Sequence, residues 1–257
     1  MSQISPSRTH LKRRIDDYLW RSDEMPIQRL RNILSNYFLP HGDVAIIGGL
    51  IRDLARRGPS GFKSDIDLVI DSSPRSVERI ARQLGATKNR FGGFGLRTPL
   101  WKIDFWALRN TWAHRHGYAK ITSLGDLTNS TFFNIDAVIY IINSRELIAK
   151  ECYVGELLSR KLEINLLPNP SVEGNALRAV RRLLAWNMRP GVILSNFLKD
   201  EVSDRVFRYI VDTEVSLYGF SYASRYEDRN MLLDGLLNWK FRTPLNSDNS
   251  DQYHFPF

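Results

Sequence analysis

The apolar residues of the chain follow both a strand period and a helix period up to about residue 150, and only a helix period beyond it. Residues 44–47 form a short apolar run typical of a buried strand, and Leu50, Ile51 and Leu54 follow at helical spacing. Further strand-like stretches occupy residues 65–70, 101–109 and 137–142. We therefore predict a first domain of strands and helices over residues 1–150 and a helical second domain over residues 151–257.

Capping residues mark where several helices begin and end. Ser73-Pro74 opens and Gly85 closes a predicted helix with Val77 and Ile80 in its apolar stripe. Two more helices, over residues 9–20 and 26–39, are predicted before the first strand. In the second domain we predict helices over residues 153–162, 171–188, 193–199, 202–215 and 226–239.

Residues 87–109 are predicted to form a hairpin. Its turn would be F-G-G-F-G at residues 91–95, because aromatic and β-branched residues flank these glycines and no helix follows them. Residues 111–130 are polar, and we expect a flexible loop there. His114 and His116 have the spacing of two metal ligands on a strand, but no suitable third ligand is near, so zinc is not expected. Residues 137–142 would then be the final strand.

Two motifs lie close together after the first strand. Gly48-Gly49 joins that strand to a helix, a geometry that lets backbone amides approach an anion. Asp65 and Asp67 alternate with apolar residues, which places both carboxylates on one face of a strand. Such neighbours repel each other unless a cation lies between them, and hard oxygen donors favour Mg²⁺. Either motif alone is commonly a plain turn or a solvated strand end, whereas the combination is more specific.

The charge and the cysteine content of the chain indicate which partners and which compartment to expect. The 257-residue chain has 36 Lys and Arg against 28 Asp and Glu, a formal charge of +8, and its pI is about 9.7. This balance favours nucleic acid or another polyanion, with a merely soluble basic protein as the alternative. The single Cys152 excludes an internal disulfide and indicates a reducing, intracellular setting. Without a signal-peptide core or a membrane-length apolar run, we expect a cytoplasmic protein with no membrane partner.

The order of strand, G-G, helix and D-x-D strand resembles that of the nucleotidyltransferase superfamily. G-G-L-I-R-D at residues 48–53 and S-D-I-D-L at residues 64–68 are most similar to the head domain of the CCA-adding enzymes and bacterial poly(A) polymerases. The resemblance covers about residues 40–188. It implies an α/β (α+β) catalytic domain of the polymerase β type with a mixed sheet, followed by an all-helical domain.

The resemblance also implies a metal site made of three carboxylates. Asp65, Asp67 and Asp104 would hold two Mg²⁺ ions, with Mn²⁺ as an alternative, because this superfamily places a third acid on a strand beside the D-x-D strand. Arg109 would be the arginine that follows that acid five positions later. Since a lone carboxylate in an apolar strand needs a charged partner, Asp104 has a second explanation, a structural ion pair with Lys102 or Arg109.

Phosphate contacts are implied at the start of the first motif. Gly48 and Gly49 would supply backbone donors to the phosphates, and Arg52 and Lys63 would add positive charge. Asp53 belongs to the same motif. The alternative for Arg52 and Asp53 is that they only pair with each other within the first turn of the helix.

Two later segments match the family in part. Asp126 with Leu127 matches its D-L pair, and Arg178 and Arg181 match helix positions that contact the incoming base; they share one helical face. Ion pairs to neighbouring helices are the alternative for both arginines. Asn129, Ser130 and Thr131 replace the arginines and aspartate that handle ribose and phosphates, Asn175 replaces an arginine, and Glu173 is out of register with the base-reading acid. Selection of C and then A in the usual way is therefore not expected.

We expect a Mg²⁺-dependent nucleotidyltransferase that moves a nucleotidyl group from an NTP to an acceptor hydroxyl, with a tRNA-like RNA 3′ end as the favoured acceptor. The compact chain and the altered segments favour an alternative, a toxin or phage-defence enzyme that makes an oligonucleotide signal or modifies another acceptor. A third class, a nucleotide- or partner-binding relic, is disfavoured by the three carboxylates. The sequence specifies neither the nucleotide nor the oligomeric state.

Overall fold

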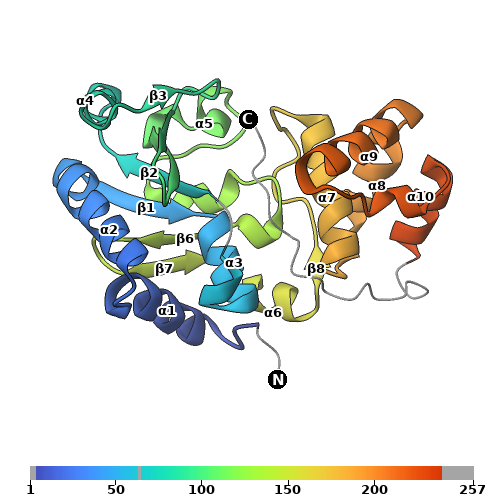
Figure 1. Ribbon diagram of the computed structural model, residues 1–257, viewed down its shortest axis with the longest axis horizontal. Helices are drawn as coiled ribbons and strands as arrows, with labels where there is room; N and C mark the ends of the chain where they lie inside the picture. Colours follow the sequence, from blue (N-terminus) through green and yellow to red (C-terminus); the bar gives the residue numbers. More distant parts are fainter. Residues whose placement is uncertain (1–3, 63–64, 239–257) are drawn as a thin grey trace. The chain divides into compact units, whose positions relative to one another are not determined.

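The computed structural model describes residues 4–62 and 65–238, in which the chain forms two compact units (Figure 1). The first, here called the sheet unit, comprises the chain up to Thr131 together with Ile135–Val154. The second, the helical unit, comprises Phe132–Asn134 and the chain from Gly155 onward. The chain thus enters the helical unit briefly before it completes the sheet.

A seven-stranded mixed sheet forms the centre of the sheet unit within the described residues. Its middle strands β1 (Asp43–Ile47), β2 (Ile66–Asp71) and β5 (Lys102–Ala107) carry the predicted apolar runs. β2 and β5 are parallel, and every other neighbouring pair is antiparallel. From edge to edge the order is β3 (Thr87–Lys88), β4 (Phe94–Arg97), β5, β2, β1, β6 (Val138–Ile141) and β7 (Glu146–Ala149). The mixed sheet confirms the predicted fold class.

Two helices follow the middle strands β1 and β2 and pack on the sheet. α3 (Gly49–Arg57) follows β1 and contacts β1, β2 and β6, and α4 (Pro74–Leu84) follows β2 and contacts β4 and β5. α4 begins at Ser73, whose side chain accepts a hydrogen bond from Ser76, and ends at Gly85, which has a φ of 65°. The predicted start and end of this helix are therefore confirmed.

The N-terminal helices are anchored to the sheet by aromatic contacts. α1 (Arg8–Asp16) and α2 (Met25–Ile33) each continue into a π-helical turn, at Asp17–Arg21 and Leu34–Phe38. Phe38 meets Phe105 of β5 with 5.1 Å between the ring centroids. Both rings are fully buried. The helices predicted before the first strand therefore close part of the core.

The opposite face of the sheet is covered by the segment that follows β5. Leu108, Ile121, Leu124 and Leu127 pack there against the sheet residues Ala45, Val69 and Ile139. This segment contains the short helical turns Leu108–Asn110, α5 (Trp112–Arg115) and Leu124–Asn129. The prediction of a flexible loop over residues 111–130 is wrong, because these apolar residues bury themselves against the sheet.

The predicted hairpin over residues 87–109 is a three-stranded meander. The turn lies at residues 89–93, where the Asn89 side chain accepts hydrogen bonds from the amides of Phe91 and Gly93 at 3.0 and 2.9 Å. Phe94 and Gly95, expected in the turn, belong to β4. A second turn follows β4 and leads into β5. β7 pairs with β6, so the strand predicted as the last one is followed by another.

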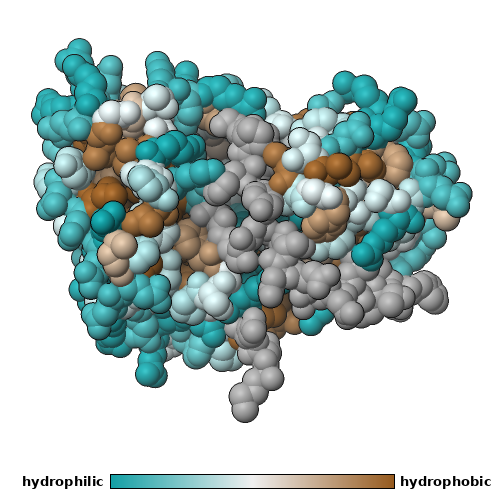
Figure 2. Space-filling view, in the orientation of Figure 1, coloured by the Kyte–Doolittle hydropathy of each residue, from teal (hydrophilic) through white to brown (hydrophobic). Residues whose placement is uncertain are grey.

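The helical unit consists mainly of helices. α6 (Tyr153–Leu158) crosses its boundary, and α7 (Val172–Ala185), α8 (Val192–Glu201), α9 (Asp204–Tyr218) and α10 (Arg229–Leu237) follow. A parallel pair of two-residue strands, β8 (Lys161–Leu162) and β9 (Arg189–Pro190), was not predicted. Because β8 begins at Lys161, the helix that was expected up to residue 162 ends earlier, at Leu158. Figure 2 shows hydrophobic residues on the surface of this unit, and its exposed apolar side chains include Val192, Ile193 and Val215. No helix among the described residues is long and apolar enough to cross a bilayer.

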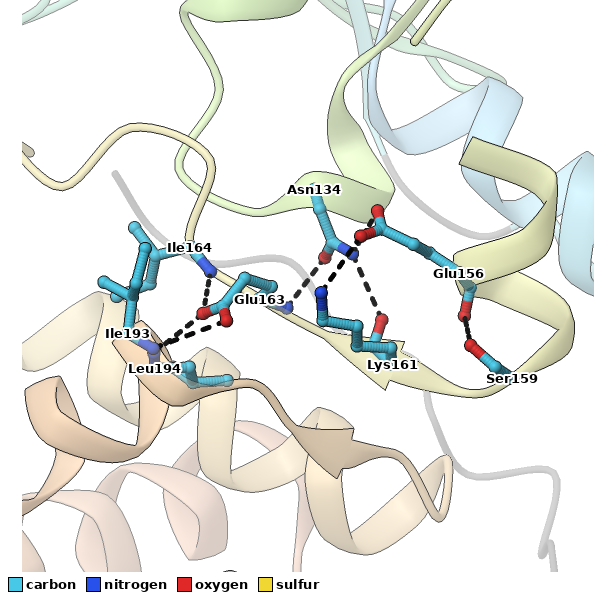
Figure 3. A network of polar contacts seen from close by, with 8 residues as sticks. All are labelled: Asn134, Glu156, Ser159, Lys161, Glu163, Ile164, Ile193 and Leu194. Carbon is cyan, nitrogen blue, oxygen red and sulfur yellow. Dashed lines mark hydrogen bonds and ion pairs between the residues drawn. The ribbon is translucent and has the colours of Figure 1, made fainter. Parts of the chain in front are cut away.

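A polar network stabilises the start of the helical unit (Figure 3). Glu163 accepts hydrogen bonds from the backbone amides of Ile164 and Leu194, both at 2.8 Å, and of Ile193 at 3.3 Å. Its carboxylate thereby caps α8, whose own N-cap residue, Gly191, has no side chain. Asn134 donates to Glu156 at 2.9 Å and accepts from the amide of Glu163 at 2.9 Å.

Candidate active site

The Gly48-Gly49 turn lies beside the D-x-D strand. β1 ends at Ile47, which is paired with Asp67 of β2, so the first turn of α3 begins next to that carboxylate. Gly48 has a φ of 68°, a conformation that favours glycine. Its amide donates to the carbonyl oxygen of Val138 at 3.1 Å. The expected phosphate donor at Gly48 is therefore engaged in the fold, and the amides that start α3 at Gly49 are the ones left without helical acceptors.

Asp67 and Asp104 stand directly opposite each other on parallel strands. The register of β2 and β5 pairs Ile66 with Ile103 and Asp67 with Asp104. Paired residues of neighbouring strands point to the same face of a sheet, and Asp65 shares that face because it lies two positions before Asp67. The three predicted carboxylates are thus placed on one face at the beginning of two central strands.

Two of these carboxyl groups, Asp67 and Asp104, have raised pKa values. Burial raises the pKa of Asp67 to about 8, with further contributions from the negative charges of Asp104, Asp65 and Asp136, while Arg52 opposes the shift. Burial also raises the pKa of Asp104, against the lowering effect of Arg97. Carboxyl groups whose pKa is raised in this way favour either protonation or a bound cation.

Asp104 has a cationic partner that the sequence did not reveal. Arg97 of β4 lies 3.0 Å from Oδ1 of Asp104 and donates a hydrogen bond to its Oδ2 at 3.3 Å. The contact with Oδ1 is an ion pair without hydrogen-bond geometry, so this buried oxygen keeps unused acceptor capacity. The ion pairs proposed with Lys102 and Arg109 are thus replaced by one with Arg97, although Lys102 also lowers the pKa of Asp104 through its charge. Arg109 is exposed in the turn after β5.

Arg52 is held between two carboxylates. Its Nε and Nη2 lie 2.9 and 2.8 Å from Oδ1 of Asp53, and its Nη1 donates to Oδ1 of Asp136 at 2.7 Å. Arg52 and Asp53 are buried, and both carboxylates help raise the pKa of the guanidinium, against the effect of burial. The pairing of Arg52 with Asp53 within the helix start is therefore present. Sequence reasoning missed Asp136, although a charged residue two positions before the apolar strand β6 was a signal for it.

The donor set suits a divalent cation in its chemistry. Asp65, Asp67 and Asp104 offer hard oxygen donors, Oδ1 of Asp104 is buried without a hydrogen bond, and the charge of Asp65 acts on both other carboxyl groups. In residues 4–62 and 65–238, no group of three or more aspartate, glutamate, histidine or cysteine side chains is already closed into a metal-binding cluster. The residues thus fit a cation in the chemistry of their donor atoms.

The remaining predicted residues have other surroundings. Lys63 lies outside the described residues. Asp126 accepts hydrogen bonds from the amide and hydroxyl of Thr122 at 2.8 and 2.7 Å and from the amide of Ser123 at 2.9 Å. These bonds lower the pKa of Asp126 to about 2 and form a capping box for the turn Leu124–Asn129. This carboxylate is thus occupied locally.

Arg178 and Arg181 lie on α7 in the helical unit. Arg178 donates to Asn175 of the same helix. Arg181 is buried, donates to Glu214 of α9 at 2.8 Å, and stacks over the Tyr218 ring at 3.5 Å from its centroid. The alternative of an ion pair to a neighbouring helix is therefore realised for Arg181. His114 and His116 are likewise engaged, since a ring nitrogen of His114 accepts from the amide of Ile121 at 3.2 Å and His116 Nδ1 donates to the carbonyl of Trp112 at 2.8 Å.

No family model and no curated protein sequence matches the chain. Among solved structures, a CCA-adding enzyme with CTP matches with a TM-score of 0.54 and 18% identity, over 79% of this chain and 49% of that one. A CCA-adding enzyme with ATP matches with a TM-score of 0.53 and 20% identity, over 79% and 50%. The Thermotoga maritima CCA-adding enzyme complexed with tRNA matches with a TM-score of 0.50 and 19% identity, over 77% and 49%.

The chain therefore spans about half the length of these enzymes. At such identities the similarity concerns the course of the backbone. In its fold, the chain is similar to these CCA-adding enzymes.

Proposed function

We propose that the protein transfers a nucleotidyl group from a nucleoside triphosphate to an acceptor hydroxyl. The observation that carries this proposal is the register of Asp67 with Asp104 at the centre of the sheet, beside a helix start. Perturbed pKa values such as those of these two opposed carboxyl groups are common at functional sites, and a metal-dependent transfer reaction requires such a pair. The fold shared with nucleotidyltransferases supports the same reaction class.

The chain's own residues supply the arrangement for this reaction. Asp65, Asp67 and Asp104 would hold two Mg²⁺ ions, which when bound activate the acceptor hydroxyl and screen the triphosphate. The amides that begin α3 at Gly49 would meet the phosphates at the positive end of the helix dipole. Arg52 is fixed by Asp53 and Asp136, so it contributes positive charge near Asp67 without rearrangement. Catalysis would rest on positioning and charge neutralisation.

An RNA 3′ end is the acceptor that we favour. The formal charge of +8 suits a polyanion. Similar folds occur in enzymes solved with tRNA and with nucleotides. In this proposal the RNA approaches the carboxylates with its terminal hydroxyl, and the nucleotide lies over the start of α3.

A second acceptor class is supported by the segment before β6. Asn129, Ser130 and Thr131 carry no charge, and Asp126 is occupied by Thr122 and Ser123. Ribose and phosphate recognition of the CCA-adding type therefore lacks its charged groups in this segment. Synthesis of a short oligonucleotide signal, or modification of another acceptor, is the alternative function that this difference favours.

One incubation separates these functions. Purified protein is mixed with each labelled NTP and dNTP and Mg²⁺ or Mn²⁺, with and without total RNA, and the products are resolved on gels and by mass spectrometry. Extended RNA would support the favoured acceptor, and free oligonucleotides or labelled protein would select the alternative. The matched control is Asp104→Asn, which removes a carboxylate charge at nearly constant shape. Transfer by this variant at the wild-type rate, or no product from any nucleotide, would contradict the proposed reaction.

A further inference from the structure

The excess positive charge of the protein is concentrated in one stretch of the sheet unit. Residues 79–125 contain nine lysines and arginines and one acidic residue, Asp104. Their net charge of +8 equals the formal charge of the whole chain, so the rest of the sequence is neutral overall. All of these cations except Lys102 are exposed. A polyanion would therefore be attracted to this part of the surface.

Three aromatic rings lie next to one another in the same stretch. Trp112 and Tyr118 are stacked with 5.2 Å between their centroids and 29° between their planes. His116 is nearly parallel to Tyr118, at 8° and 6.2 Å, and lies 4.9 Å from Trp112. The side of this cluster formed by His116 and Tyr118 is open to solvent, and Tyr118 is 49% exposed.

The backbone holds these rings in place. The amide of His116 donates a hydrogen bond to the carbonyl of Trp112 at 3.2 Å, and the amide of Tyr118 donates one to the carbonyl of Ala113 at 2.9 Å. Between them Gly117 has a φ of 73°, which permits the tight return of the chain. The rings are thus preorganised, so a ligand that stacks on them would cost little conformational entropy.

Cations flank the rings. A Cβ atom added to Gly92 would lie 2.5 Å from Nη1 of Arg115, which places that guanidinium over the turn between β3 and β4. In the same turn Arg90 lies over the ring of Phe91, 4.8 Å from its centroid. β3 and α5 occupy the same end of the sheet unit in Figure 1. The surface formed by Trp112, His116, Tyr118, Arg90 and Arg115, here called the stacking surface, therefore combines ring faces with cations.

We propose that the stacking surface binds single-stranded nucleic acid. Exposed rings stack on unpaired bases, whereas a duplex keeps its base faces covered, and the cations bind the phosphates between the bases. An acidic peptide would use the cations but not the ring faces, so the combination favours nucleic acid. The inference goes beyond the proposed transfer reaction, whose carboxylates do not require this surface.

Fluorescence anisotropy of a labelled, unstructured RNA of about twelve nucleotides tests the proposal, with the corresponding duplex as comparison. Tyr118→Ala should weaken binding of the single strand about tenfold, because base stacking is lost. The salt dependence of binding should stay unchanged, because every phosphate contact is kept. Tyr118→Phe should retain binding. Arg115→Gln should lower the slope of log affinity against log salt by about 0.7.

The controls are a tyrosine and an arginine outside the stretch. Tyr37→Ala and Arg29→Gln, both at exposed positions, should bind the single strand as the wild type does. Asp67→Asn should also bind it, which separates this proposal from the transfer reaction. Equal affinity for duplex and single strand, unchanged affinity of Tyr118→Ala, or an equal loss in Tyr37→Ala would each overturn the proposal.

Discussion

Arg181 donates a hydrogen bond from Nη1 to Oε1 of Glu214 over 2.8 Å, and the side chain that receives it has no solvent exposure. The other oxygen of Glu214 accepts from the hydroxyl of Ser221 at 2.6 Å and from the amide of Ala223 at 3.0 Å. Arg181 therefore completes a buried network that joins α7 to α9. Arg181 lies on the helix face that was predicted to contact a base, but its guanidinium is already bound to Glu214.

The first prediction concerns this ion pair. Arg181→Met should lower the free energy of unfolding by about 3–5 kcal/mol, because it leaves the Glu214 carboxylate buried without its cation. The double variant Arg181→Met with Glu214→Gln should lose less, because no buried charge remains while Ser221 and Ala223 keep an acceptor. Urea unfolding measures both. If Arg181→Met were as stable as the wild type, the buried pair would not have the role described.

The nucleotide preference provides a second readout for the same helix. Arg181→Lys should leave the kcat/KM ratios among the four NTPs unchanged in protein that remains folded. Arg178→Lys is the matched variant one turn away, and it stays the candidate for relaxed discrimination. If the kcat/KM ratios among the four NTPs changed in Arg181→Lys but not in Arg178→Lys, Arg181 would be the residue that contacts the base.

The second prediction concerns the room beside Asp104. Gly95 stands opposite Asp104 in the sheet, and a Cβ atom at this position would lie 2.8 Å from Oδ1 of that carboxylate. Gly95→Ala should therefore displace the carboxylate and reduce transfer strongly while the melting temperature changes little. Gly155→Ala is the control, since a Cβ atom there meets nothing within 4 Å. Wild-type turnover in Gly95→Ala would show that the position of Asp104 is unimportant.

The third prediction is a pH dependence caused by Asp67. Its pKa is raised to about 8, from an ordinary value of about 4, so the folded state favours the protonated carboxyl. The corresponding stability is fully present below pH 4 and is lost as the pH rises to about 8. Asp67→Asn has no proton to lose at this position. The melting temperature of this variant relative to the wild type should therefore rise from pH 4 to pH 8 and become constant above it.

Added Mg²⁺ should reduce that difference. A cation stabilises the ionised carboxylates of the wild type, and its effect should be larger at pH 8 than at pH 6 because it competes with the proton of Asp67. Thermal melts with Mg²⁺ and with an equal ionic strength of NaCl distinguish binding from screening. The same increase in both salts would count against a specific cation site.

The fourth prediction concerns the cap of α8. Glu163→Ala removes the acceptor for the amides of Ile164, Ile193 and Leu194, and it should cost about 1–2 kcal/mol, as the loss of a helix cap does. Glu173→Ala is the control, because Glu173 pairs with the exposed Arg205 and such pairs contribute about 0–1 kcal/mol. Equal losses in both variants would mean that the cap contributes no more than a surface ion pair.

The sequence predicted well what depends on neighbouring residues. The two-residue period of Asp65 and Asp67, the apolar runs of β1 and β6, and the glycine at the end of α4 are local signals, and the structure contains each of these elements. The partners of the charged side chains were not predictable in this way. Asp136 is 84 positions from Arg52, and Glu214 is 33 positions from Arg181. Periodicity gives the face on which a residue lies but not which distant residue will meet it.

The stretch after β5 illustrates the same limit. Its polar residues suggested a loop, yet Ile121, Leu124 and Leu127 are buried against the sheet. Burial there depends on a sheet face that the chain builds from strands far away in sequence. Arg97 escaped notice for a similar reason, because only the pairing of β4 with β5 brings it to Asp104.

The parallel pairing of β2 with β5 also links the position of the carboxylates to the packing of the core. A slip of β5 by one residue would turn Asp104 to the opposite face of the sheet, where Ile103 and Phe105 are now buried, and would expose those apolar side chains in exchange. Misregistered sheets would therefore bury a charge and lose core packing at the same time. Burial of the apolar residues on either side of Asp104 therefore fixes the strand register that positions this acid.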